Sequence, residues 1–258
     1  MKKFMTFAAM FAAVAIAFTA CNKEEKPQGG NTTVTTCPDC GENLEDCTCD
    51  DFTSAVSIDG DFADWNALDA SKVVSIQGNP DALYTALTSA KIYVDEVYIC
   101  IYFEFDPEYI TEGNAAFDIY LNEDNVDGLY DDYYVGQTGV DVLLEDGVFM
   151  EGGKFNSFNP GLFEYTLPVD QEWDWGWSEV LPADSGIATG AGNGNKYELA
   201  IVKEMLMGVE LADTFSLGLM LTDIVGPDWN CVGVLPNAAM DEVNTNGKAA
   251  FVHVPNVK

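Results

Sequence analysis

Three tryptophans alternate along residues 171–180, "QEWDWGWSEV". Alternate residues of a strand project from one face, so Trp173, Trp175 and Trp177 would share a face while Asp174 lies on the other. Indoles stack on the apolar faces of sugar rings, and nearby Asp or Asn side chains bind the hydroxyls. The same alternation is typical of a core strand. We expect one or two of these indoles in the core and at least one at the surface.

A second indole with polar neighbours lies in "GPDWNC", where Trp229 stands between Asp228 and Asn230. Proline, aspartate and asparagine favour a loop, which predicts an exposed ring beside two hydrogen-bonding side chains. Trp229 is therefore the other candidate sugar platform. Trp65, in "ADWNAL", we interpret as a core residue.

The segment "DIYLNEDNVDGLYDD" is dense in oxygen ligands of the kind that calcium binds. The candidate metal ligands are Asp118, Asn122, Asp124, Asn125 and Asp127. The segment is not an EF-hand, because Tyr134 stands where the bidentate glutamate would be. Asn, Asp and Gly are also turn residues, so a solvated hairpin loop is the alternative.

Nucleophilic catalysis has little support, since His253 is the single histidine of the chain. A glycosidase needs two carboxylates, and Glu164, Glu172 and Glu179 lie nearest the tryptophans. With 43 acidic residues in the chain, no pair can be singled out. We predict that the protein is not an enzyme.

The charge balance narrows the choice of partners. The chain has 43 acidic residues against 11 lysines, no arginine, and a formal net charge of -32. Nucleic-acid binding needs a basic face, so this class of partner is excluded. Bound divalent cations would relieve the self-repulsion of so acidic a chain.

The N-terminus has the pattern of an export signal. Lys2 and Lys3 precede the apolar run 4–18, which ends in "FTAC" at Cys21. This ending resembles the lipobox of bacterial lipoproteins, with Phe18 where leucine is usual. The resemblance implies a signal peptide at 1–20 and a lipid-modified Cys21, with palmitate among the attached acyl chains, that anchors the chain without spanning the membrane. The following "NKEEK" resembles signals that send lipoproteins of Bacteroidetes-type bacteria to the cell surface, so we expect a location on the outer membrane.

Residues 21–53 are predicted to be a flexible tether, because they hold few apolar residues and many polar ones. Its cysteines form a C-x2-C-x6-C-x-C pattern at Cys37, Cys40, Cys47 and Cys49. Four thiolates can hold zinc, whereas exported proteins usually oxidise such cysteines to disulfides. Both readings stay open, as does a disulfide between Cys100 and Cys231.

From residue 54 onward the pattern predicts an all-β fold. "AKIYVDEVYICIYFEFD" (90–106) has the alternation of a hairpin, and further strand candidates recur every ten to fifteen residues. Convincing helical periodicity is confined to about one turn at "VKEMLMG" (202–208). We expect a single antiparallel β-sandwich, jelly-roll-like, over 54–258.

Four blocks of this region resemble carbohydrate-binding module family 9-like and DOMON-like β-sandwiches: "VSIDGDFADWNAL", "AKIYVDEVYICIYFEFD", "FDIYLNEDNVDGLYDDYYVGQTGVDVLLEDG" and "NKYELAIVKEML". The resemblance implies glycan binding without cleavage, and it favours the predicted calcium site, because the family contains such sites. It also implies a structural role for part of the W-x-W stretch. We therefore expect a non-catalytic glycan-binding lipoprotein module, with partner proteins from a polysaccharide-uptake system. The alternatives are a structural or protein-interaction module that binds no sugar and, behind it, a glycoside-acting enzyme.

Overall fold

The computed structural model describes residues 54–124, 140–165, 176–206, 210–237 and 251–258. The chain divides into two compact units, Met1–Thr53 and Ser54–Lys258, and every described residue belongs to the second. The signal peptide, Cys21 and the four tether cysteines therefore lie outside the described residues, and the expectations about them stay predictions.

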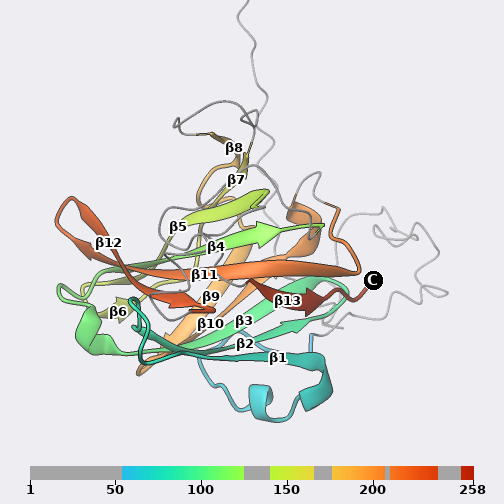
Figure 1. The fold of residues 1–258 in the computed structure, drawn as a ribbon, viewed down its shortest axis with the longest axis horizontal. Helices are drawn as coiled ribbons and strands as arrows, with labels where there is room; N and C mark the ends of the chain where they lie inside the picture. The colour runs from blue at the N-terminus through green and yellow to red at the C-terminus, as the bar shows by residue number, and fades with distance from the viewer. Residues whose placement is uncertain (1–53, 125–139, 166–175, 207–209, 238–250) are drawn as a thin grey trace, which may run out of the picture. The chain divides into compact units, whose positions relative to one another are not determined.

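Two antiparallel sheets pack face to face, which confirms the predicted all-β sandwich (Figure 1). The smaller sheet has the order β1-β2-β3-β10-β9, made of Val73–Gln77, Leu87–Val94, Tyr98–Phe105, Lys196–Val202 and Ala188–Asn193. The larger has the order β12-β11-β4-β5-β7-β8, made of Asp228–Leu235, Thr214–Val225, Ala115–Asn122, Val142–Glu151, Gly161–Tyr165 and Trp177–Leu181. Two short strands complete it: β13 (Val252–Pro255) pairs with β11, and β6 (Lys154–Phe155) pairs with β5.

Aromatic rings from both sheets fill the space between them. Phe103 of β3 stacks on Phe117 of β4 with centroids 4.2 Å apart, and Phe149 of β5 meets Phe103 edge-on at 5.4 Å. The alternation predicted for 97–105 is correct, since Ile99, Phe103 and their alternates face this core. The predicted hairpin is β2 and β3, which pair through their whole length with one irregularity near Leu87.

The outer face of the smaller sheet is covered by the segment that precedes β1. This segment contains the 3-10 turns η1 (Asp64–Asn66) and η2 (Ala70–Lys72), and it packs Val56 and Trp65 against Cys100 and Tyr102 of β3. Trp65 is buried, as predicted.

A buried carboxylate fastens this segment to the sheet. Glu198 of β10 accepts hydrogen bonds from the amides of Asp59 and Gly60 at 3.0 and 2.8 Å, and from Trp65 Nε1 at 2.8 Å. Two of the blocks quoted above, "IDG…DW" and "KYEL", therefore meet in space although more than 130 residues separate them. The short helical turns η3 (Pro107–Tyr109) and η4 (Lys203–Met205) complete the described elements, and η4 lies where the helical turn was predicted.

Candidate functional site

The described tryptophans divide into two buried rings and one exposed ring. Trp65 and Trp177 are buried, with 6% of Trp177 exposed, whereas 44% of Trp229 is exposed. Trp173, Trp175 and Asp174 lie outside the described residues. The expectation that one indole of that stretch is exposed therefore stays a prediction for Trp173 and Trp175.

Trp177 belongs to a second apolar layer, on the outer face of the larger sheet. It pairs with Tyr165 across β7 and β8, and the two rings meet edge-on at 5.1 Å. Tyr120 and Leu143 belong to the same cluster. Since its indole is enclosed by these side chains, Trp177 offers no stacking face for a sugar, and it is one of the core indoles that we expected in this stretch.

Trp229 lies on a strand, and the prediction that it lies in a loop is wrong. Strand β12 begins at Asp228, and Trp229 is paired with Ile224 of β11. The turn residues before it form the tip of the β11–β12 hairpin instead. The polar neighbours were predicted correctly, because Asp228 and Asn230 are both exposed beside the ring.

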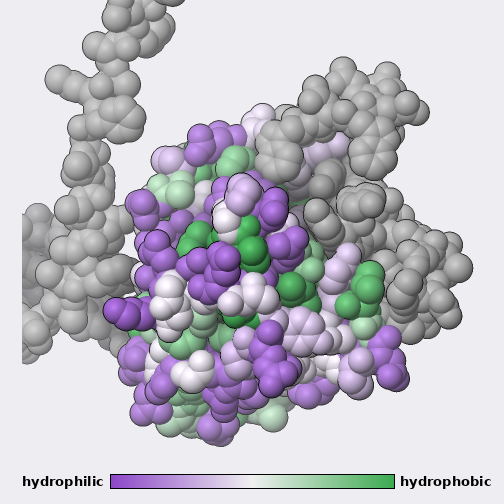
Figure 2. Space-filling model, turned by 90° about the vertical axis from the view of Figure 1, so that its left-hand side faces the viewer, coloured by the Kyte–Doolittle hydropathy of each residue, from purple (hydrophilic) through white to green (hydrophobic). Residues whose placement is uncertain are grey.

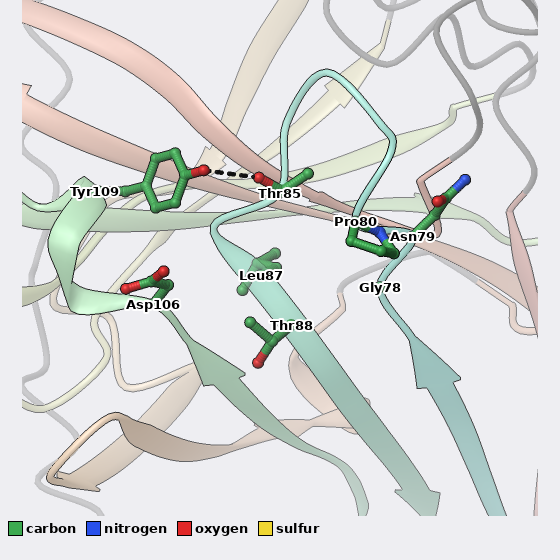
Figure 3. Close-up of a pocket in the computed structure, with 8 residues that line it drawn as sticks. All are labelled: Gly78, Asn79, Pro80, Thr85, Leu87, Thr88, Asp106 and Tyr109. Atoms are coloured by element: carbon green, nitrogen blue, oxygen red, sulfur yellow. Dashed lines mark hydrogen bonds between the residues drawn. The ribbon is translucent and has the colours of Figure 1, made fainter.

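A pocket opens along the same edge of the sandwich. Thr85 forms an isolated bridge with Gly233 of β12, and the Ala86 amide donates to the Val232 carbonyl at 3.0 Å. The cavity beside this bridge has a volume of about 450 Å³ (Figure 3). Its lining comes from three segments: Gly78, Asn79, Pro80, Thr85, Leu87, Thr88, Asp106 and Tyr109.

Local sequence explains how the pocket wall is held. Asp106 caps the turn η3 by accepting from the Glu108 amide at 3.0 Å, and Pro107 starts that turn with its fixed φ. This turn places Tyr109 on the rim, where 41% of it is exposed and its hydroxyl lies 2.9 Å from Thr85 Oγ1. In Figure 3 the Tyr109 hydroxyl points toward Thr85, and Asp106 lies below the ring.

The opposite wall is tied down by an asparagine pair. The Asn79 amide donates to Asn237 Oδ1 at 2.7 Å, and Asn237 Nδ2 donates to the Asn79 carbonyl at 3.2 Å. Leu83, in the loop that follows, is 57% exposed. Four large hydrophobic side chains are exposed among the described residues: Leu83, Tyr109, Trp229 and Val257. Leu83 and Tyr109 belong to segments that border the pocket, and Trp229 belongs to β12, which bridges to Thr85 of one of these segments.

Strand β12 carries Trp229 and also borders the pocket, because its Gly233 bridges to the pocket-lining Thr85. Gly233 lies four positions beyond Trp229, a backbone span of about 13 Å at the rise of a β-strand. Figure 2 shows the end of the molecule onto which the β11–β12 hairpin and η3 project; polar residues dominate it, with small hydrophobic patches between them. The edge therefore combines exposed aromatic rings, a cavity and hydrogen-bonding groups.

The sequence did not single out Asp106, Tyr109 or Leu83. The signal for the first two was present, because "FEFDPEY" reads as a strand followed by an aspartate cap, proline and a turn, which exposes the tyrosine. The predicted hairpin of 90–106, when extended, places this turn beside residues 85–88, because Leu87 pairs with Phe105. No local signal indicates that residues 78–80 line the same pocket.

The expected calcium ligands are only partly described. Asp118 and Asn122 are buried on β4 and Asp124 is exposed, while Asn125 and Asp127 lie outside the described residues. Asp118 Oδ1 accepts from the Asp146 amide at 3.1 Å. Within the described part of the chain, no three His, Cys, Asp or Glu side chains are placed to hold a metal ion. Calcium stays a prediction.

This end of the larger sheet nevertheless disfavours negative charge. Burial raises the pKa of Glu123, with further contributions from Asp141 and Asp124. Burial also raises the pKa of Asp141, and it raises that of Glu145 to about 7 with help from Asp146. A bound cation would offset these costs.

Two arrangements of candidate catalytic side chains can be checked among the described residues. Ser216 Oγ lies 2.8 Å from His253 Nδ1, but Ser216 is 1% exposed and so closed to a substrate. Glu164 pairs with Ser178, and Glu179 pairs with Phe163, so Glu164 and Glu179 project from opposite faces of the sheet. They cannot flank one glycosidic bond as a pair. Glu172 lies outside the described residues.

Cys100 and Cys231 are free thiols. Cys100 packs on the outer face of the smaller sheet and Cys231 on that of the larger, so the core separates them. The disulfide considered between them is wrong.

Comparisons with protein-family models, with curated proteins and with solved structures found no match for this chain. The resemblance to family 9-like carbohydrate-binding modules therefore stays a prediction. No helix in the described ranges is long and apolar enough to cross a membrane.

Proposed function

We propose that this β-sandwich is a non-catalytic glycan-binding module, and that the edge formed by β12 and the Tyr109 pocket is its binding site. The observation that carries the proposal is the exposure of Trp229 between exposed Asp228 and Asn230. A large flat ring at the surface is costly without a ligand, and the two flanking side chains are suited to sugar hydroxyls.

The pocket supplies a second contact for a longer ligand. Tyr109 offers a half-exposed ring, and Asn79 and Asp106 offer polar groups, beside the point where Thr85 bridges to Gly233 of β12. An extended oligosaccharide would contact both, so one sugar stacks on Trp229 while another enters the cavity. Separated contacts of this kind favour binding of an oligosaccharide over binding of a single monosaccharide.

The cellular setting belongs to the same proposal. An anchored, surface-exposed lipoprotein with a glycan site would hold polysaccharide at the outer membrane for partner proteins of an uptake system. Calcium bound near Asp118 and Asn122 would stabilise the acidic end of the larger sheet. Zinc or disulfides in the tether would act outside the sandwich.

Affinity electrophoresis of the full chain over a panel of soluble glycans, with calcium present, tests the binding. We expect retardation on at least one glycan. Trp229→Ala should remove about 1.4 kcal/mol or more of binding free energy, a tenfold weakening, and Trp229→Phe should retain part of it. Val257→Ala, an exposed apolar residue near the C-terminus, is the control. Absence of retardation on every glycan would contradict the proposal.

A protein-interaction module is the second candidate, and the exposure of Leu83 favours it. An aliphatic side chain suits a protein partner better than a sugar, and Leu83 lies in the loop beside the pocket. Under that reading, Leu83→Ala would weaken capture of a surface partner while glycan binding is absent. Under the glycan reading, Leu83→Ala leaves retardation on the glycan unchanged.

A further inference from the structure

The pocket beside Tyr109 carries a carboxylate and no cationic side chain among its lining residues. Asp106 Oδ1 is engaged by the Glu108 amide at 3.0 Å. Among the described residues no hydrogen bond is made to Asp106 Oδ2. A carboxylate oxygen only accepts hydrogen bonds, so a ligand group that approaches it must be a donor, such as a sugar hydroxyl.

Further acidic residues lie in the turn that holds Asp106, just after it, and at the start of β12. Glu108 follows in the same turn, Glu112 Oε2 accepts from the Gly226 amide at the hairpin tip at 3.3 Å, and Asp228 starts β12. None of the described lysines lines the pocket. Lys91 shares β2 with Leu87 and Thr88, but its ammonium lies over the Tyr102 ring, as does that of Lys196. The others are Lys203 at Asp95, Lys258 at Asp213, Lys72 before β1, and Lys154 on β6.

We propose that the glycan bound at this edge is uncharged, with Asp106 accepting hydrogen bonds from its hydroxyls and rejecting sugars that carry carboxylate or sulfate groups. This inference rests on the proposed glycan binding and names the class of ligand. An anionic substituent in the pocket would lose hydration beside Asp106 and meet no cation in return. The net charge of -32 acts in the same direction at long range.

The test uses matched pairs of polysaccharides with one backbone and different charge. The full chain is run against hydroxyethyl cellulose and carboxymethyl cellulose, against dextran and dextran sulfate, and against a panel of other neutral glycans. Each neutral glycan that retards the chain is then compared with its own sulfated derivative. We expect retardation on a neutral glycan and at least about tenfold weaker binding of its anionic partner.

Calorimetry at high salt separates the pocket from the overall charge. At 1 M NaCl the screening length falls to about 3 Å, so long-range repulsion by the whole chain is removed while contact at Asp106 persists. We expect the preference for the neutral glycan to remain. Equal affinity for both members of a pair at 1 M NaCl would overturn the assignment to the pocket.

Two substitutions that each remove one negative charge complete the design. Asp106→Asn keeps the cap of η3 but replaces the free acceptor, and it should weaken neutral-glycan binding about tenfold and reduce the rejection of the anionic glycan. Glu108→Gln, exposed and outside the pocket lining, should change neither. Equal effects of both variants would overturn the role of Asp106.

The failures are distinguishable. Binding of anionic glycans as tight as that of neutral ones overturns the neutral-ligand inference and leaves the glycan-binding proposal standing. If Trp229→Ala loses glycan binding and Asp106→Asn does not, the binding site is confined to the Trp229 ring, and the proposal that the pocket contributes to it is overturned. Retardation on no glycan, neutral or anionic, overturns both proposals.

Discussion

Replacing Glu198 by glutamine tests how the N-terminal segment is held. The carboxylate is fully buried and accepts three hydrogen bonds, from the amides of Asp59 and Gly60 and from Trp65 Nε1. Glutamine has nearly the same shape, and its single oxygen can still accept from the two amides. Its NH₂ group then faces the Trp65 donor, so that one hydrogen bond is lost and a buried donor is left unsatisfied.

The size of the effect follows from these contacts. A hydrogen bond to a charged group contributes about 1.5–3 kcal/mol, and the unsatisfied Trp65 donor adds about 1 kcal/mol, against a desolvation gain from removing the charge. We expect the free energy of unfolding to fall by about 2–4 kcal/mol, and Tm by about 4–16 °C for a unit of this size.

Urea unfolding and calorimetry of the wild type and Glu198→Gln measure this change. Glu151→Gln, on an exposed site of β5, is the matched control and should shift the unfolding free energy by less than about 0.5 kcal/mol. Trp65→Phe removes the indole donor, and the double variant should show a coupling of about 1 kcal/mol or more. A Glu198→Gln variant as stable as the control would refute the claim that the Glu198 carboxylate holds the N-terminal segment on the sheet.

Three further outcomes follow from the structure. The pKa of Glu145 is raised to about 7, so the folded state binds its proton more tightly than the unfolded state, and Glu145 lowers stability as pH rises from 4.5 to 7. Glu145→Gln should therefore flatten the dependence of Tm on pH in this range and raise Tm at higher pH. Parallel Tm profiles of the variant and the wild type would contradict this. Gly192→Ala should lower the free energy of unfolding by about 1–3 kcal/mol, because a Cβ would lie 2.5 Å from the Phe155 ring. Thr189→Ser on the same strand should lower it little. Equal unfolding midpoints of the two variants in urea would count against this packing. Calcium should raise Tm and EDTA should reverse the rise, because a bound cation offsets the crowded carboxylates; a Tm unaffected by either removes the metal site.

Alternation of apolar and polar residues was enough to predict those strands that pack one face against the core. The hairpin of β2 and β3 is the clearest case, because its apolar residues recur with period two and its turn is acidic. Strand β9 is not predictable from residues Ala188–Asn193, which lack apolar alternation. Its glycines leave room for the rings of Phe155 and Tyr197, so this edge strand packs through the side chains of its neighbours and has no apolar alternation of its own.

The candidate site was predictable only in part. Polar residues on both sides of Trp229 indicated an exposed ring, and the structure has one. The even spacing of 173–177 gave no such information, because period two places residues on one face without saying whether that face is covered, and Trp177 proves to be covered. The pocket depends on the bridge between Thr85 and Gly233, a long-range pairing that no local pattern encodes.

Calorimetric titration of the retarding glycan into the wild type and into Trp229→Ala tests the central proposal most directly. Binding to the wild type, weakened about tenfold or more in Trp229→Ala with the melting temperature unchanged, is the predicted result. Equal dissociation constants for the two proteins would contradict a glycan site at the exposed indole of β12.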